Sequence, residues 1–325
     1  MQANAEAGTA QQVNGKQTPA FDKRPIGYEL LLLLITMLWG STFVAQSVAM
    51  DRIGPFTYVA ARFLVSSLVL LVISLVSTAI RRKKLAKEGK ELVINWKRTV
   101  IGGFFCGLAL FLASWTQQQG LVTTTVGEGS FISSCYIVFV PIAGIIFRKK
   151  PNINAWLGVL MALIGLYFIS IEKNGEMISI TAGNLWMMAS AILYTAQIMT
   201  VDEFSKGTDL FWLATFEFGT IALLGLPCAF LFEKVVLKDV LFVWGPILYA
   251  ALVSGCFCYS LQNVTQKHIE PTLASLIMGT EAVFAALSGA LFLHEQLSAR
   301  KLIGCGFVML AILVAQIRFK KTKNA

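Results

Sequence analysis

The sequence predicts an all-helical integral membrane protein in which ten transmembrane helices form two inverted repeats of five. Three observations predict this fold class: a composition that is 56% hydrophobic over 325 residues, ten long apolar stretches, and a likeness between the first five stretches and the last five. A helix needs about 20 residues to cross a bilayer, and each stretch is long enough. Because five is an odd number, a second copy that follows directly enters the membrane upside down, as in secondary transporters whose substrate site lies at the repeat interface.

The apolar stretches follow one another with short polar connections. In the first half they are Tyr28–Ser47, Gly54–Ala79, Thr99–Gln119, Thr125–Phe147 and Ile153–Ile171. In the second half they are Thr181–Val201, Leu210–Phe232, Leu241–Val264, Pro271–His294 and Ala299–Ile317. A shift of 146 positions places Ser114 on Ser260 and Gly158 on Gly304, and it needs no gap from Ser114 to Ile169. Any two membrane helices resemble each other, but the helix and loop lengths also match, which favours a duplication.

These limits divide the chain into four segments. Residues 1–27 form a polar tail without an apolar core, which we expect to be disordered in the cytoplasm and not to act as a signal peptide. Residues 28–171 and 181–317 form the two repeats, and residues 318–325 form a cytoplasmic C-terminal tail.

The net charge of +9 is distributed unevenly along the chain. With the N-terminus in the cytoplasm, the cytoplasmic segments carry 20 Lys or Arg residues and the outside segments carry six. This distribution follows the positive-inside rule and predicts that both termini are cytoplasmic in a multi-pass protein of the cell (inner) membrane. The basic residues then meet the anionic headgroups of the lipid bilayer, so the charge does not indicate a nucleic-acid partner.

Motifs of enzymes and of cofactor binding are missing from the sequence. There is neither a phosphate-binding G-x-x-x-x-G-K-[ST] motif nor an H-E-x-x-H motif, and no nucleophile stands beside a base. The six cysteines lie inside apolar stretches without metal-ligand spacing, so they are expected to be small buried hydrophobic residues. The sequence therefore predicts neither an enzyme nor a site for a metal or cofactor.

Four ionisable residues lie within the apolar stretches: Arg62, Glu128, Glu217 and Glu281. At 1.5 Å per residue, all except Glu128 are about 10–16 Å deep, whereas Glu128 is near the outer end of its helix. Such groups are costly in a bilayer and usually face a cavity or a partner, so they are candidates for binding substrate or coupling protons. The structural alternatives are that Arg62 pairs with one glutamate and that Glu128 is stabilised by the dipole of its helix.

Uncharged polar and aromatic residues recur at helical spacing and are candidates for lining a cavity. These candidates are Trp39, Gln46, Trp115, Gln118, Tyr194, Gln197, Tyr259, Gln262, Asn263 and Gln266. On the first helix the predicted stripe is Thr36, Gly40, Phe43 and Ser47, with Trp39 and Gln46 on its flanks. Interhelical hydrogen bonds, worth about 1 kcal/mol each, are the structural alternative for each stripe. Small residues at four-residue spacing, such as Gly103 and Gly107, permit close helix packing and are a weak indication of a homodimer.

Several segments resemble the EamA domain, which occurs twice in the ten-helix drug/metabolite transporter superfamily. They are LWGSTFVAQ in the first helix, PFTYVAARF in the second, TTTVGEGSFISSCYIVFVPIAGIIFRKKPNINAWLGVLMALIGLYFI in the first repeat and PTLASLIMGTEAVFAALSGALFLHEQLSARKLIGCGFVMLA in the second. Ala282 stands where the family usually has proline, His294 where glycine is usual, and Lys149 replaces an acidic residue. These departures concern the local kink geometry.

The resemblance implies a secondary active transporter that exports a small polar metabolite by alternating access, with amino acids or related compounds favoured. A zwitterion would place its ammonium near Glu281 or Glu217 and its carboxylate near Arg62 or a helix N-terminus. Trp39, Tyr194 and Tyr259 offer ring faces to a cation. Protons are candidate coupling ions. Two alternatives stay open: import of a small metabolite or a sugar-type solute, and, from another class, a membrane enzyme or a sensor that does not transport.

Overall fold

The computed structural model describes residues 26–147, 151, 153–170, 181–292 and 298–316, and the described residues form helices and no strands. The first half contains α1 (Ile26–Met50), α2 (Pro55–Lys87), α3 (Trp96–Leu121), α4 (Val126–Ser133), α5 (Tyr136–Ile146) and α6 (Ile153–Ser170). The second half contains α7 (Ala182–Phe204), α8 (Leu210–Phe232), α9 (Leu237–Phe242), α10 (Trp244–Tyr249), the π-helix η1 (Ala250–Tyr259), α11 (Ser260–Gln266), α12 (Pro271–Met278), α13 (Glu281–Phe292) and α14 (Ala299–Gln316). Nearly all of both predicted tails, together with Lys149 and His294, lies outside the described residues.

In the part of the chain that the structure describes, seven helical segments are long and apolar enough to cross a membrane. They are α1, α2, α3, α8 and the composite segments Val126–Ile146, Trp244–Gln266 and Pro271–Phe292. The other three predicted crossings correspond to α6, α7 and α14. The apolar part of α6, Ile153–Ile169, is shorter, and α7 carries polar residues such as Asn184, Gln197 and Asp202, which lower its mean hydropathy. The chain is therefore a multi-pass membrane protein.

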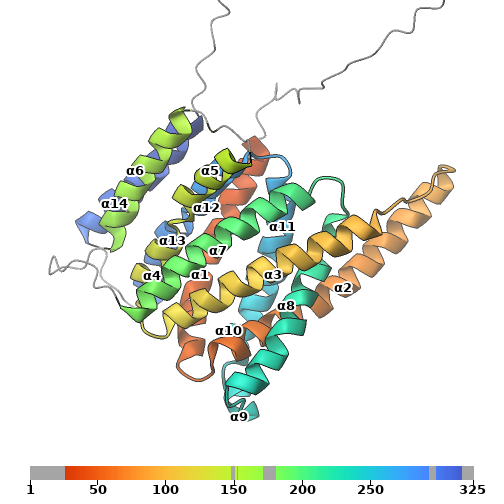
Figure 1. Ribbon diagram of the computed structural model, residues 1–325, viewed down its shortest axis with the longest axis horizontal. Coiled ribbons are helices and arrows are strands. Elements are labelled where there is room, and N and C mark those ends of the chain that lie inside the picture. Colours follow the sequence, from red (N-terminus) through yellow and green to blue (C-terminus); the bar gives the residue numbers. More distant parts are fainter. Residues whose placement is uncertain (1–25, 148–150, 152, 171–180, 293–297, 317–325) are drawn as a thin grey trace, which may run out of the picture.

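The helices form one bundle with a distinct helix pair, α6 and α14, at one of its ends. In Figure 1, α6 and α14 lie side by side at one end, while α2 and α8 pair at the opposite side. Between them, α3 packs against both α7 and α8, and α1 packs against α13. The buried rings of Phe63, Phe218 and Tyr259 meet at centroid distances of 5.2 to 6.1 Å and join α2, α8 and η1.

Glycines allow the closest helix contacts. A Cβ on Gly40 of α1 would lie 2.6 Å from the backbone nitrogen of Ala285 on α13, so only glycine permits this approach. Gly103 and Gly107 of α3 pack in the same way against Phe216 and Glu217 of α8. This predicted pair of small residues is thus used for packing within the chain.

Two predicted helices, Thr125–Phe147 and Pro271–His294, are not continuous. Each is interrupted by a two-residue turn, at residues 134–135 and 279–280. The backbone N–H groups of Cys135 and Thr280 bond to the carbonyl three residues earlier instead of four, at 3.1 Å in both cases. The Thr280 hydroxyl also bonds to the Ile277 carbonyl at 2.7 Å, in competition with the helix backbone. Under the 146-residue shift the first turn maps onto residues 280–281, so the two turns overlap at one position and differ by one residue.

Two further expectations need correction. The predicted loop 81–98 is shorter, because α2 continues as far as Lys87; its sequence RRKKLAK consists of strong helix formers. The predicted helix Leu241–Val264 begins only at Trp244, and its centre is a π-helix. π-Helical turns often occur at functional sites.

Candidate functional site

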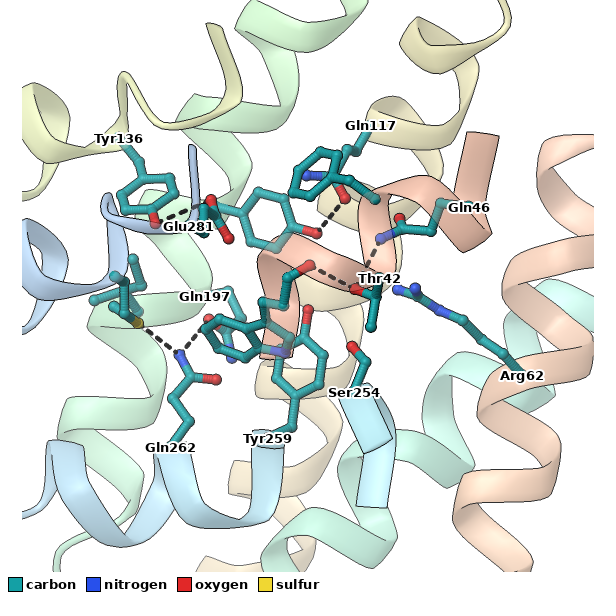
Figure 2. A pocket seen from close by; sticks show the side chains of 15 residues that line it. Thr42, Gln46, Arg62, Gln117, Tyr136, Gln197, Ser254, Tyr259, Gln262 and Glu281 are labelled. Carbon is teal, nitrogen blue, oxygen red and sulfur yellow. Dashed lines mark hydrogen bonds between the residues drawn. The ribbon is translucent and has the colours of Figure 1, made fainter. Parts of the chain in front are cut away.

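A small cavity lies at the centre of the bundle, where residues from both halves of the chain meet. Its lining residues are Trp39, Thr42, Phe43, Gln46, Arg62, Gln117, Tyr136, Tyr194, Gln197, Ile198, Ser254, Tyr259, Gln262, Met278 and Glu281 (Figure 2). The cavity has a volume of about 30 Å³. One water needs roughly 10–15 Å³ by this measure, so the cavity holds about two waters and must widen for a metabolite.

Opposite charges enter the cavity from opposite sides, with Arg62 on α2 and Glu281 at the start of α13 (Figure 2). Glu281 is 7% exposed and accepts hydrogen bonds from the hydroxyls of Tyr136 at 3.1 Å and Ser134 at 3.4 Å. Tyr136 and Ser134 flank the break between α4 and α5, so the broken helices of the two repeats meet at this carboxylate.

Arg62 is held by neutral and aromatic groups. Its Nη2 donates to Ser114 Oγ at 3.4 Å, and its guanidinium lies 4.5 Å from the ring centroid of Phe63 and 5.4 Å from that of Tyr58. Within the described residues no ion pair joins Arg62 to a glutamate. The cavity therefore presents one cation and one carboxylate that do not neutralise each other.

Amides and hydroxyls form the rest of the polar lining. Gln117 donates to Ser133 Oγ at 2.9 Å and accepts from Tyr194 OH at 3.0 Å. Gln46 donates to Thr42 Oγ1 at 3.3 Å. The rings of Trp39 and Tyr259 pack with their centroids 4.9 Å apart. These contacts give the cavity hydrogen-bonding groups of both kinds beside aromatic surface, as expected of a site for a small polar molecule.

Glu217 is fully buried and lies behind the cavity wall. It accepts from Gln197 Nε2 and from Asn263 Nδ2, both at 3.3 Å. Gln197, which lines the cavity, accepts in turn from Gln262 Nε2 at 3.4 Å. Glu217 is thus connected to the cavity through amide side chains but does not line it.

The remaining predicted residues lie outside the cavity lining. Gln118 hydrogen-bonds to Gln46, and Trp115 stacks on Phe56 at 4.8 Å. Gln266 is buried at the end of α11, and neither polar atom of its amide has a hydrogen-bond partner among the described residues.

Glu128 also lies away from the cavity, in the first turn of α4. It accepts from Asn184 Nδ2 at 2.7 Å, and its backbone N–H bonds to Thr125 Oγ1. These contacts agree with its structural alternative.

The structure also adds lining residues that the sequence reasoning missed, Thr42, Gln117, Tyr136, Ile198, Ser254 and Met278, and it places Phe43 of the predicted stripe in the lining. On α1 the lining face runs through Trp39, Thr42, Phe43 and Gln46, whereas Thr36 and Gly40 of the predicted stripe contact the α12–α13 region. The close approach at Gly40 fixes this rotation of the helix. Gln117 lay within a polar run and could have been found, but Tyr136 stands in an apolar run and gave no signal.

Together the apolar helices and the enclosed polar cavity define a membrane transporter. The chain belongs to the EamA-like transporter family, whose model matches residues 27–171 and 181–316 as two EamA repeats. An uncharacterized transporter of Archaeoglobus fulgidus is 26% identical over 292 residues, which cover 89% of this chain and 86% of that protein. The uncharacterized transporter YoaV of Bacillus subtilis is 25% identical over 300 residues, covering 90% and 97% of the two chains. The names of these relatives indicate transporters and not enzymes.

A solved crystal structure shares the fold. It superposes with a TM-score of 0.70 at 16% sequence identity and covers 89% of this chain and 96% of the other. At this identity the likeness concerns the fold alone.

Proposed function

We propose that this protein is a secondary active transporter that exports a small polar metabolite, with amino acids as the leading class. The observation that carries the proposal is the pair of opposite charges in the cavity, Arg62 and Glu281, which are not joined to each other. A buried charge is strongly destabilising unless it is paired. A zwitterion would supply both missing partners, with its carboxylate at Arg62 and its ammonium at Glu281.

The contact between α6 and α14 supports the inverted arrangement of the two repeats. A Cβ on Gly158 would meet the carbonyl oxygen of Ala311 at 2.8 Å, and a Cβ on Gly165 would meet that of Gly304 at 2.6 Å. Adding 146 to 158 and 165 gives 304 and 311, so each contact is the symmetry mate of the other. Residue numbers rise along α6 while they fall along α14, so the helices are antiparallel. A twofold axis that relates two antiparallel helices is perpendicular to both, and if the helices cross the membrane this axis lies in the membrane plane, as the proposed inverted repeat requires.

This symmetry supports ten crossings and alternating access. If α6, α7 and α14 also cross, each repeat has five helices and its own broken helix, and the two breaks meet at the cavity. An exchange of conformation between the two repeats then exposes the site first to one side of the membrane and then to the other. We propose the cell (inner) membrane with both termini in the cytoplasm because of the asymmetry in basic residues. The export direction follows from the resemblance to exporters of amino acids.

Counterflow in proteoliposomes tests the substrate class. Vesicles that contain the purified protein are loaded with the twenty standard amino acids and are then diluted into buffer that contains trace amounts of the same amino acids in radiolabelled form. Vesicles without protein serve as the control. We expect saturable accumulation of label, and none when labelled glucose replaces the amino acids on both sides. Accumulation of glucose alone, or of neither, would contradict the proposed class.

A further inference from the structure

A second buried carboxylate, Glu217, lies behind the cavity wall and is not among the lining residues. It is 0% exposed, and its hydrogen-bond donors are two neutral amides, Gln197 from α7 and Asn263 from α11. The facing titratable group from α3 is the thiol of Cys106, and α2 packs against α8 here through Phe63. No charged group faces Glu217 among the described residues. An ionised carboxylate in such a place is strongly disfavoured unless it takes up a proton or a cation.

The amides around Glu217 form a directed chain that ends in the cavity. Gln262 Nε2 donates to Gln197 Oε1 at 3.4 Å, and Gln197 Nε2 donates to Glu217 Oε1 at 3.3 Å. In both bonds the donor lies on the cavity side and the acceptor lies on the side of the Glu217 carboxylate. The other end of Gln262, its Oε1 atom, is buried at the cavity and has no protein partner among the described residues. With Glu217 ionised, the chain therefore leaves a free hydrogen-bond acceptor at the substrate cavity.

We propose that Glu217 is the proton-binding site of the transporter and that Gln197 and Gln262 relay its protonation state to the cavity. This inference rests on the proposed function, because it needs a substrate in the cavity. A proton from water that binds Glu217 Oε1 turns an acceptor into an O–H donor. Gln197 must then rotate its amide to accept, which turns its Nε2 toward Gln262. Gln262 rotates in turn and presents its N–H₂ group to the cavity. The same proton is later released to water, which restores the original direction.

The relay makes the proton and the substrate bind in alternation. When Glu217 is ionised, Gln262 offers an oxygen that accepts a hydrogen bond from a substrate ammonium. When Glu217 is protonated, the same position offers a donor, which repels an ammonium. Proton entry would thus drive substrate release, which is the logic of proton antiport and export. A sodium ion fits less well, because hard cations bind oxygen ligands and the amides turn their nitrogens toward Glu217.

Infrared difference spectroscopy on the full-length protein in lipid nanodiscs tests this assignment directly. The pH-dependent band of a protonated carboxyl group is recorded for the wild type, for Glu217→Gln and for Glu281→Gln. We expect a band that is absent in Glu217→Gln and retained in Glu281→Gln. Addition of the twenty standard amino acids should lower the proton affinity reported by this band about tenfold, within the usual range of coupling between two sites. Gln197→Leu should keep the band and remove its response to the amino acids.

Each outcome bears on a different claim. If Glu217→Gln is folded, as judged by gel filtration, and keeps the full band, Glu217 is not the proton site. If Gln197→Leu keeps the amino-acid response, the relay is refuted. If the band belongs to Glu217 but the amino acids change nothing in the wild type, while counterflow confirms that they are transported, the coupling is refuted. If counterflow also fails, the proposed substrate class is wrong and the proton site stands.

Discussion

Glu281→Gln separates a role in substrate binding from a role in structure. The substitution keeps the size of the side chain and removes its charge. Glu281 lines the cavity, and the hydroxyls of Tyr136 and Ser134 donate to its Oε1 atom. Both hydroxyls can donate equally to the amide oxygen of glutamine. The variant therefore keeps the local hydrogen-bond pattern and changes the charge seen by a ligand.

The contacts of Glu281 set the expected magnitudes. A hydrogen bond to a charged group is worth about 1.5–3 kcal/mol and a neutral one about 0.5–1.5, so two bonds lose about 2 kcal/mol. The desolvation penalty of a buried ion, several kcal/mol, disappears at the same time. We therefore expect the melting temperature to stay unchanged or to rise. With the amide oxygen held by the two hydroxyls, glutamine presents its N–H₂ group in place of the second carboxylate oxygen and cannot accept from a substrate ammonium. The whole bond to a charged group, about 1.5–3 kcal/mol, is then lost, which lowers affinity by about 10- to 150-fold.

The assay compares Glu281→Gln with Glu128→Gln, a glutamate of the same bilayer-embedded set that lies outside the cavity. Counterflow of amino acids should fall to background in the first variant and persist in the second. Normal counterflow by a well-expressed Glu281→Gln protein would remove Glu281 from the mechanism. A loss of 3–5 kcal/mol in stability that Arg62→Gln restores would instead show a structural ion pair, contrary to the contacts of both side chains.

Three further predictions concern the scaffold. Gly165→Ala should destabilise the protein by about 1–3 kcal/mol in thermal unfolding, because its Cβ would lie 2.6 Å from the Gly304 carbonyl oxygen. The control Gly306→Ala should have no such effect, since nothing lies within 4 Å of the added Cβ. Equal effects of the two substitutions would contradict the α6–α14 contact. Glu233→Ala should lower the free energy of unfolding by about 0.5–2 kcal/mol, because the Glu233 carboxylate accepts hydrogen bonds from the backbone N–H groups of Phe56 and Thr57, at 2.7 and 2.8 Å, and so caps α2. The exposed control Glu91→Ala should leave this free energy unchanged. In a variant without native cysteines, Lys90→Cys should react with impermeant maleimide from the cytoplasmic side and Lys234→Cys from the outside, and the reverse pattern would refute the orientation.

Hydrophobic patterning predicts the helices well and their interruptions poorly. The predicted stretch Leu210–Phe232 has the same bounds as α8, because Asp209 caps its start and the apolar run ends at Glu233. The breaks at residues 134–135 and 279–280 follow from side-chain competition and tertiary contacts, such as the bond of 2.9 Å between the hydroxyls of Thr36 and Thr280. A hydropathy pattern contains no information on such contacts.

The candidate site shows the same division. Arg62 and Glu281 were predictable, because a charge deep in an apolar stretch is costly without a purpose. Glu217 met the same criterion, and only the packing separates it from the cavity, whereas Glu128 lies in the first turn of its helix, where a structural role was the stated alternative. Tyr136 was not predictable, since its hydroxyl becomes a partner of Glu281 only when the two broken helices meet.

The polar groups of α11 indicate which half of the pathway opens more easily. Toward the proposed outside, the amides of Gln46, Gln117 and Gln118 donate hydrogen bonds to their neighbours, and Trp115 Nε1 and Gln118 Oε1 are the buried atoms of this region without a partner among the described residues. On α11, which runs from the cavity toward the proposed cytoplasmic side, buried polar atoms without a protein partner accumulate at Ser260, Gln262, Asn263 and Gln266. Each such group is destabilised by about 1–3 kcal/mol until it meets water or a ligand. Opening toward the cytoplasm hydrates these atoms, whereas opening toward the outside must break hydrogen bonds that already exist. In the proposed orientation we therefore expect this structure to open more readily toward the cytoplasm, the side from which an exporter takes up its substrate.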